Sequence, residues 1–438
     1  MRRNEQFRPG REPLSDHPNL TLRRSHVSGP FSFLNPTWAR YAPTPAPGQT
    51  KPGNLAQEGM PDTTPPAPEP ELAPTSPVKA RSIEHLWRSR DNRKGRHALK
   101  VDYRAPTPET AYIAPPPTTT VKAVVRGILR MATCAPFWDV SWLVAVTFTL
   151  GSVIWIINAF FVWLPLVDPG TEFWGEVLQG GGISAFIGAT VFEIGSVLLL
   201  LEAVNANQTG CFGWALEVEL RKVENHGAQT VTEVKPSEDE CRHHHKNRRN
   251  LVGVGRQLSH QFSREISNGY TTSSSDGKSF RWLPSCTELR THYIHELGFL
   301  ASLIQFIAAT IFWIAGFTGL PGIIDHMSQR VTNVGGTGFI LSGLLFTLET
   351  QEKWYRPAFH VLGWHIGVWN FIGGIGFTLC GALGPASTVS GVEYQATLAT
   401  FWGSWAFMIG STIQWYESLE KYPVERKTDD SASVQSEV

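Results

Sequence analysis

Long apolar runs separated by polar segments dominate the chain from residue 139 onward. A helix needs about 20 apolar residues to cross a bilayer, so each run predicts a membrane-spanning helix. Trp and Tyr lie near many of the run ends, where amphipathic rings prefer the interface. The pattern therefore predicts an all-α membrane protein with six transmembrane helices. The runs cover residues 139–164, 181–204, 297–320, 335–349, 361–384 and 397–416.

Basic residues divide the segments between these runs into two groups. Segments 165–180 and 385–396 contain no Lys or Arg, and 321–334 contains only Arg330. The segments before the first run, after the second, after the fourth and after the sixth are all basic. The excess of Lys and Arg on cytoplasmic loops then predicts that both termini are cytosolic.

The second, fourth and sixth runs share one pattern, G-x3-F-x2-[GS]-[GS]-x5-E, without gaps. The copies run from Gly188 to Glu202, from Gly335 to Glu349 and from Gly403 to Glu417. The repeating unit is then a two-helix hairpin present three times in one orientation, which predicts a roughly threefold bundle. The small residues, Phe and Glu form one helical stripe suited to close packing. We expect the three glutamates to lie at the cytosolic interface and meet Lys or Arg from neighbouring loops, with an ion-binding ring as the alternative.

The polar segments complete the predicted domain organisation. Residues 1–120 hold 21 of the 30 prolines, too many for a packed core, and predict a disordered arm with a basic patch, RSRDNRKGRHALK. No signal peptide is expected, because the N-terminus lacks an apolar core. The hairpins are predicted at 139–204, 285–350 and 361–418, with a polar cytosolic insert at 205–284 and a disordered tail at 419–438.

Residues 121–136 predict a basic helix that lies on the membrane surface. Lys122, Arg126 and Arg130 recur at every fourth position, and the valines and leucines between them lie largely on the other side. Such a helix suits an anionic leaflet, so anionic lipid is the predicted partner of 121–136 within the lipid bilayer.

Three stretches resemble a family of uncharacterised fungal multi-pass integral membrane proteins. They are ELRTHYIHELGFLASLIQFIAATIFWIAGFTGLPG, QEKWYRPAFHVLGWHIGVWNFIGGIGF and FWGSWAFMIGSTIQWYESLEKYP. The second, fourth and sixth runs are also loosely similar to the bacterial YrhK-type two-helix module. The resemblance covers about residues 120–425 without the insert. It implies a multi-pass membrane protein and no particular activity.

Glu193 is the sharpest candidate for function, because it lies deep in the second run and its counterparts in the other two copies are apolar. Ionisable residues at this depth usually face a bundle interior and mark a pathway. Gln305 and Asn370 lie at similar depth, so an intramembrane cluster with Glu193 is plausible, whereas Asn158 lies closer to the outer face. Glu193 points about 140° away from the glutamate stripe, at 100° per residue. A hydrogen-bonded structural role is the alternative.

Other chemistry is weakly signalled. His292, His295 and Glu296 have a spacing that can place metal ligands on one helix face, without any known zinc signature. The run ECRHHHK in the insert predicts a solvated loop, and Ser285 to Glu288 predicts a capping box. Nucleophile elbows, phosphate loops and paired acidic motifs are missing, so we predict no enzyme and no cofactor. No basic–aromatic pattern indicates nucleic acid binding.

Two functional classes follow from the sequence. The first is a small channel or transporter-like bundle that uses Glu193. The second is a structural or scaffold membrane protein that recruits cytosolic partners through its arm and insert. Homo-oligomerisation and the choice between plasma membrane and endomembrane stay open.

Overall fold

The computed structural model describes residues 20–43, 82–104, 116–206, 281–321 and 332–427. Short pieces at 6–8, 12–14, 78–80 and 112–114 and single residues 209 and 323 are also described. Side chains in 331–335 lie outside this part of the chain, as does most of the predicted insert.

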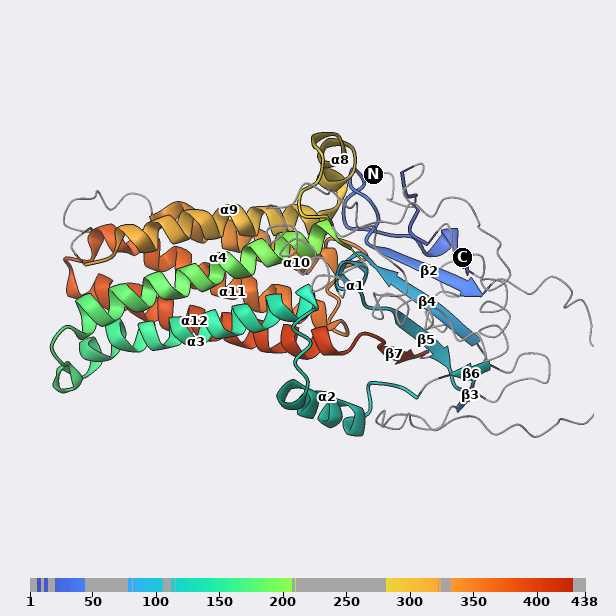
Figure 1. Ribbon diagram of the computed structural model, residues 1–438, viewed down its shortest axis with the longest axis horizontal. Coiled ribbons are helices and arrows are strands. Elements are labelled where there is room, and N and C mark those ends of the chain that lie inside the picture. The colour runs from blue at the N-terminus through green and yellow to red at the C-terminus, as the bar shows by residue number, and fades with distance from the viewer. Residues whose placement is uncertain are drawn as a thin grey trace, which may run out of the picture.

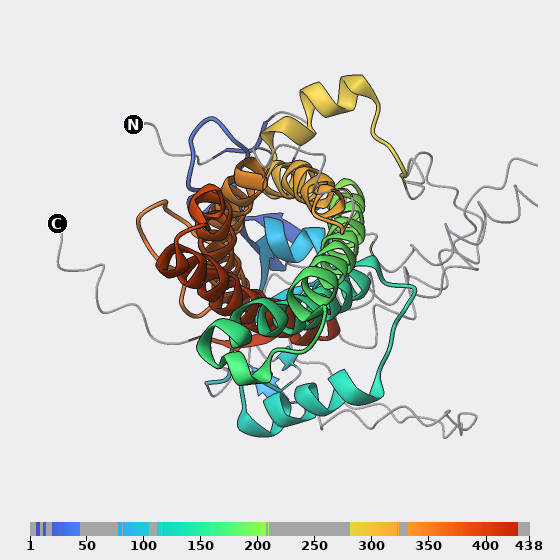
Figure 2. The same ribbon diagram turned by 90° about the vertical axis from the view of Figure 1, so that its left-hand side faces the viewer.

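Six long helices form a ring in which each packs against the next in the sequence, and the last closes against the first (Figures 1 and 2). All six predicted runs are helical. The largest difference is at the final helix, which begins at Ser390 rather than at residue 397. The helices are α3 (Val140–Val167), α4 (Gly182–Val204), α9 (Leu297–Thr318), α10 (Thr332–Glu349), α11 (Leu362–Leu383) and α12 (Ser390–Leu419).

Four stretches of this ring are long and apolar enough to cross a membrane. They are Val140–Val167, Glu176–Val204, Leu297–Thr318 and Leu362–Ala386, and the apolar part of α10, Gly336–Glu349, is shorter. Large apolar side chains such as Leu150, Ile194 and Ile307 are half exposed, as lipid-facing positions would be. The chain therefore has the features of a membrane protein.

Aromatic side chains fill the middle of the ring. The ring of Phe407 lies 5.6 Å from that of Phe192 and 6.0 Å from that of Phe339, between ring centroids, and both pairs are edge to face. Trp155 and Phe377 complete the same buried cluster. We call it the phenylalanine layer. Edge-to-face aromatic contacts add stabilisation beyond the area that they bury.

The prediction of an all-α fold with a disordered arm at 1–120 is wrong for the described residues of that arm. They supply four of the five strands of a mixed sheet, in the order β1-β2-β4-β5-β7. The strand SIEHLWR is almost wholly buried, because both of its faces are covered. The sheet comprises β1 (Leu20–Leu22), β2 (Trp38–Pro43), β4 (Ser82–Arg88), β5 (Ala98–Asp102) and β7 (Val424–Arg426).

The C-terminal segment corrects a second prediction, the disordered tail at 419–438. After α12 ends at Leu419, β7 pairs in parallel with β5, with Leu99 opposite Val424. All other strand pairs of this sheet are antiparallel. Val424 is buried in the sheet core with Ile83 and Trp87. Residues 428–438 lie outside the described part.

Shorter elements connect and flank these two parts. Thr120 caps α2, the predicted surface helix, and the predicted capping box of Ser285 and Glu288 is present at α8. The elements are η1 (Arg24–His26), β3 (Val78–Ala80), α1 (Ser89–Arg93), β6 (Tyr112–Ala114), α2 (Val121–Thr133), η2 (Pro169–Thr171), η3 (Glu176–Gly181), α8 (Cys286–Thr291), η6 (Tyr293–His295) and η9 (Gly384–Ala386).

The α11–α12 contact depends on a glycine. A Cβ on Gly376 would lie 2.6 Å from the carbonyl oxygen of Ala399 and 2.8 Å from Cα of Gly403. Both neighbours are backbone atoms, which cannot move without separating the helices.

We therefore expect Gly376→Ala to destabilise the ring by about 1–3 kcal/mol through overpacking. Thermal unfolding in detergent, followed by circular dichroism, measures the change. Gly391→Ala is the matched control, since nothing lies within 4 Å of a Cβ on that residue. Equal midpoints for the two variants would contradict the close-packing interpretation.

Candidate functional site

Helix α1 closes one end of the ring, which we call the mouth (Figure 2). It connects β4 to β5, and we call residues 89–96, which contain it, the plug. The chain reverses after α1 at Gly95, whose φ of 61° is in the left-handed region that glycine adopts readily. The sheet therefore carries the plug on a tight turn and presents it to the mouth.

Glu202, Glu349 and Glu417 meet the plug at the mouth, and all three are 0% exposed. Arg93 bridges two of them, with Nη1 donating to Glu202 at 2.5 Å and Nη2 donating to Glu349 at 2.9 Å. Arg90 donates from Nε and Nη2 to both oxygens of Glu417, at 3.2 and 2.8 Å. Such paired guanidinium–carboxylate contacts are strong and geometrically specific.

Three further plug residues complete the carboxylates' contacts. Ser89 donates to Glu349 at 3.0 Å, and Arg96 donates to Glu417 at 3.1 Å. Lys94 is fully buried, with Nζ 3.5 Å from Glu202 and 4.0 Å from Glu417. Burial lowers the pKa of Lys94 to about 8, although the two glutamates favour its charged form.

The buried charges at the mouth balance. Among the described residues, five cations pair with five carboxylates at and around the plug. Nine of these ten groups are buried and Glu425 is partly exposed, so opposite charges offset the cost of burial. Burial opposes the charge of Arg93, but Glu349 and Glu202 outweigh it and raise the pKa of Arg93. The groups are Arg88, Arg90, Arg93, Lys94 and Arg96 with Asp91, Glu202, Glu349, Glu417 and Glu425. We call these ten groups the mouth cluster.

The sequence predicted cationic partners for the three glutamates but not their source or their burial. We expected hydrated pairs with neighbouring loops, whereas Arg90, Arg93 and Lys94 come from the basic patch in the N-terminal arm. The available signal was that patch, flanked by the alternating segments SIEHLW and HALKVDY. The high proline content of the arm by itself predicted disorder rather than a folded segment.

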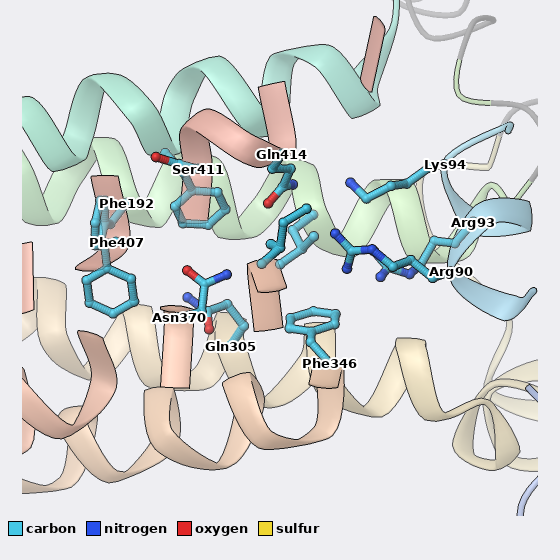
Figure 3. A pocket seen from close by; sticks show the side chains of 13 residues that line it. Arg90, Arg93, Lys94, Phe192, Gln305, Phe346, Asn370, Phe407, Ser411 and Gln414 are labelled. Atoms are coloured by element: carbon cyan, nitrogen blue, oxygen red, sulfur yellow. The ribbon is translucent and has the colours of Figure 1, made fainter. Parts of the chain in front are cut away.

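A small cavity lies on the ring axis between the plug and the phenylalanine layer (Figure 3). Its volume is about 30 Å³, which holds a few water molecules. The amide side chains of Gln305, Asn370 and Gln414 line it, with Arg90, Arg93 and Lys94 at one end. Gln414 is only 6% exposed, and within the described residues none of the three amides has a hydrogen-bond partner.

Glu193 does not line this cavity. It lies between α4 and α9, half-buried, and its Oε1 accepts a hydrogen bond from Thr310 at 2.9 Å. The predicted cluster is therefore only partly formed: Gln305 and Asn370 share the cavity, and Glu193 is outside it. The reason is the position of Glu193 around the helix. Phe192 lines the cavity, and Glu193 lies on a different face of α4.

Asn158 has a local structural role at the opposite end of the ring from the mouth. Its side-chain nitrogen lies 2.6 Å from the carbonyl oxygen of Gly181, to which it donates, and 3.0 Å from the hydroxyl oxygen of Ser184. These bonds satisfy backbone and hydroxyl groups where the π-helical turn η3 leads into α4.

The weak metal candidates do not assemble as one helix face. His292 ends α8, His295 ends the separate turn η6, and Glu296 precedes α9. Oε1 of Glu296 lies 4.0 Å from Nδ1 of His292, and it also accepts a hydrogen bond from Asn35 at 2.5 Å. Among the described residues, no group of three or more His, Cys, Asp or Glu side chains could hold a metal ion. The run ECRHHHK lies outside the described residues.

Helix α2 has the two faces that its sequence predicted. Val121, Ile128 and Leu129 are more than half exposed, and Gly127 packs on Tyr416 of α12. Arg130 lies 3.7 Å from Glu420, which is just beyond the end of α12. The helix is therefore held beside the mouth with an uncovered apolar face.

No protein family, curated protein or solved structure matches the chain. The resemblance to fungal integral membrane proteins stays a prediction.

The mouth cluster predicts a large stability effect for Arg93→Met, because the change leaves Glu202 and Glu349 without their main partner. Breaking a buried ion pair costs about 3–5 kcal/mol. Thermal unfolding of the detergent-solubilised protein, with trypsin cleavage at the plug as a second readout, measures it.

Arg281→Met is the matched control, since Arg281 pairs with Glu288 and both side chains are about a third or more exposed. Surface pairs contribute about 0–1 kcal/mol, so this variant should unfold almost as the wild type does. A similar midpoint for both variants would refute a stabilising role for the mouth cluster.

Proposed function

We propose that this protein is a small channel or transporter-like membrane bundle, seen with its path closed. The observation that carries the proposal is the polar cavity on the ring axis, lined by Gln305, Asn370 and Gln414. A bundle that only anchors a domain gains stability by filling its axis with apolar side chains. Amides without protein partners are costly there unless water or a ligand satisfies them.

The path is blocked in two places. The plug fills the mouth, and the phenylalanine layer fills the ring below the cavity. Conduction therefore requires both to move. The plug is the better candidate for a gate, because it is attached through ion pairs. Water can solvate the separated charges once they are exposed.

This proposal shifts the functional residues away from Glu193. A carboxylate beside Thr310, on the side of the bundle, does not border the axial cavity. We propose that Glu193 is a hydrogen-bonded structural residue between α4 and α9, which was the alternative in the sequence prediction.

The finer topology is also proposed. We propose that all six ring helices span the bilayer as three repeated hairpins, with the mouth and both termini cytosolic. The distribution of Lys and Arg supports this orientation. The three motif phenylalanines meet in one layer and the three motif glutamates meet at the plug, which supports a threefold repeat.

Helix α2 would then lie at the cytosolic surface of the bilayer. Its exposed apolar face would enter the headgroup boundary, and Lys122 and Arg126 would face anionic lipid. Plasma membrane and endomembrane both offer such a leaflet.

A scaffold is the second candidate function. The attachment of the sheet to the ring favours it: Trp38 donates to the carbonyl oxygen of Thr350 at 3.0 Å and packs against Ala358 and Val361, just before α11. Such a platform would present the sheet and the insert to cytosolic partners, with the ring as an anchor or as a unit of a homo-oligomer.

Flux through proteoliposomes tests the choice. In the double variant Arg93→Gln with Glu349→Gln, the plug is held less firmly, while Lys94 remains to pair with Glu202. We expect release of chloride or potassium, followed with ion-selective electrodes, to rise several-fold above wild type.

The matched control replaces a surface pair, Arg281→Gln with Glu288→Gln, and should leave the flux at the wild-type value. Glu193→Gln should also leave it unchanged. If all of these proteins are folded and none conducts, the channel proposal fails and the scaffold is favoured.

Helix α2 gives a separate prediction. A spin label at Ile128→Cys, in a background without other cysteines, should be only weakly accessible to a water-soluble relaxation agent in nanodiscs. Accessibility should fall further when phosphatidylserine is included, because the basic side chains bind anionic headgroups. Electron paramagnetic resonance measures both.

The label at Lys122→Cys is the control and should stay accessible in either lipid. Replacing Arg126 and Arg130 with Gln should remove the phosphatidylserine dependence at Ile128. A label at Ile128 that is accessible in both lipids would show that α2 faces water.

A further inference from the structure

We infer that the axial cavity is a binding site for a small inorganic anion of halide size. The cavity lies within the ring, and its lining combines buried cations with hydrogen-bond donors (Figure 3). The inference that an anion binds here rests on these contacts. Only a role for the site in ion permeation rests on the proposed function.

The charge of the lining favours an anion. Arg90, Arg93 and Lys94 form one end of the cavity, and no Asp or Glu is among its described lining residues. The carboxylates that balance these cations belong to the helices around the plug rather than to the cavity wall. An ion in the cavity therefore meets the positive groups directly, which disfavours a cation.

Donors remain for a ligand. Lys94 has three N–H groups, and its nearest carboxylate oxygens lie at 3.5 and 4.0 Å, longer than an ordinary ion pair. Arg90 bonds to Glu417 through Nε and Nη2, and its Nη1 has no partner within the described residues. These groups can donate to an anion without breaking the contacts that hold the plug.

The amides complete the site on the other sides. Gln414 from α12, Asn370 from α11 and Gln305 from α9 converge on the cavity from three helices, as Figure 3 shows. Each carries two N–H donors that the described protein leaves unused. Gln414 is buried and unpartnered, so a bound ligand or water is needed to satisfy it.

The size of the cavity limits the ligand. A volume of about 30 Å³ suits one small inorganic anion, and it is too small for a large organic anion. Phe192 and Phe407 of the phenylalanine layer close the far side of the cavity, so the space for a ligand does not continue along the ring axis.

Binding is tested on the full-length protein in phosphatidylcholine nanodiscs. Sodium chloride or bromide replaces sodium gluconate at constant ionic strength, and the thermal midpoint and the ³⁵Cl NMR line width are measured. We expect halide to raise the midpoint saturably and the protein to broaden the chloride line, with bromide competing.

Gln414→Leu keeps the side-chain volume and removes the amide, and it should weaken halide binding about tenfold or more, as expected for a lost hydrogen bond to a charged group. Gln395→Leu is the matched control: it lies on the same helix, is exposed, and should bind as wild type does. Asn370→Leu replaces Gln414→Leu if that variant does not fold.

The site is refuted if halide changes neither the midpoint nor the line width, which would mean that the cavity holds only water. It is also refuted if Gln395→Leu weakens binding as much as Gln414→Leu. If halide binds saturably but the double variant Arg93→Gln with Glu349→Gln shows no flux, the binding site stands and the channel proposal fails. If that variant conducts but halide does not bind, the channel proposal stands and the binding site fails.

Discussion

The structure depends on one interaction, the pairing of three buried glutamates with the cations of the plug. Each glutamate ends a ring helix, so without a partner each would place an uncompensated charge in the interior. Arg93 alone contacts two of the three, and Arg90 donates to both carboxylate oxygens of the third. The ring and the sheet are therefore joined through charges that neither part could bury by itself.

This constraint explains features that are far apart in the sequence. Residues 82–104 hold the plug between the paired strands β4 and β5, and the C-terminal segment returns as β7 to cover the outer side of β5. Gly298 and Gly363 lie where side chains would collide with Glu349 and with Arg90, respectively. A static attachment would serve a scaffold equally well. The polar cavity behind the plug is what favours a closed path.

The candidate site was only partly predictable. The positions of Glu202, Glu349 and Glu417 followed from the repeated motif, and Gln305 and Asn370 from their depth. Glu193 was misplaced because depth does not determine which side of a helix faces the axis. Arg90, Arg93 and Lys94 were missed as partners because they lie more than 100 residues from the nearest glutamate that they bind.

The sequence by itself determined the helices, the cap of α8, and the membrane class of the protein, because these depend on local hydropathy and on neighbouring side chains. Tertiary structure alone decided that a proline-rich arm contains a sheet, that β7 completes it, and which polar groups share the axis. Those outcomes depend on pairing between segments remote in the chain. The basic patch has little apolar surface of its own, and the glutamates of the ring supply the opposite charges that its buried cations need.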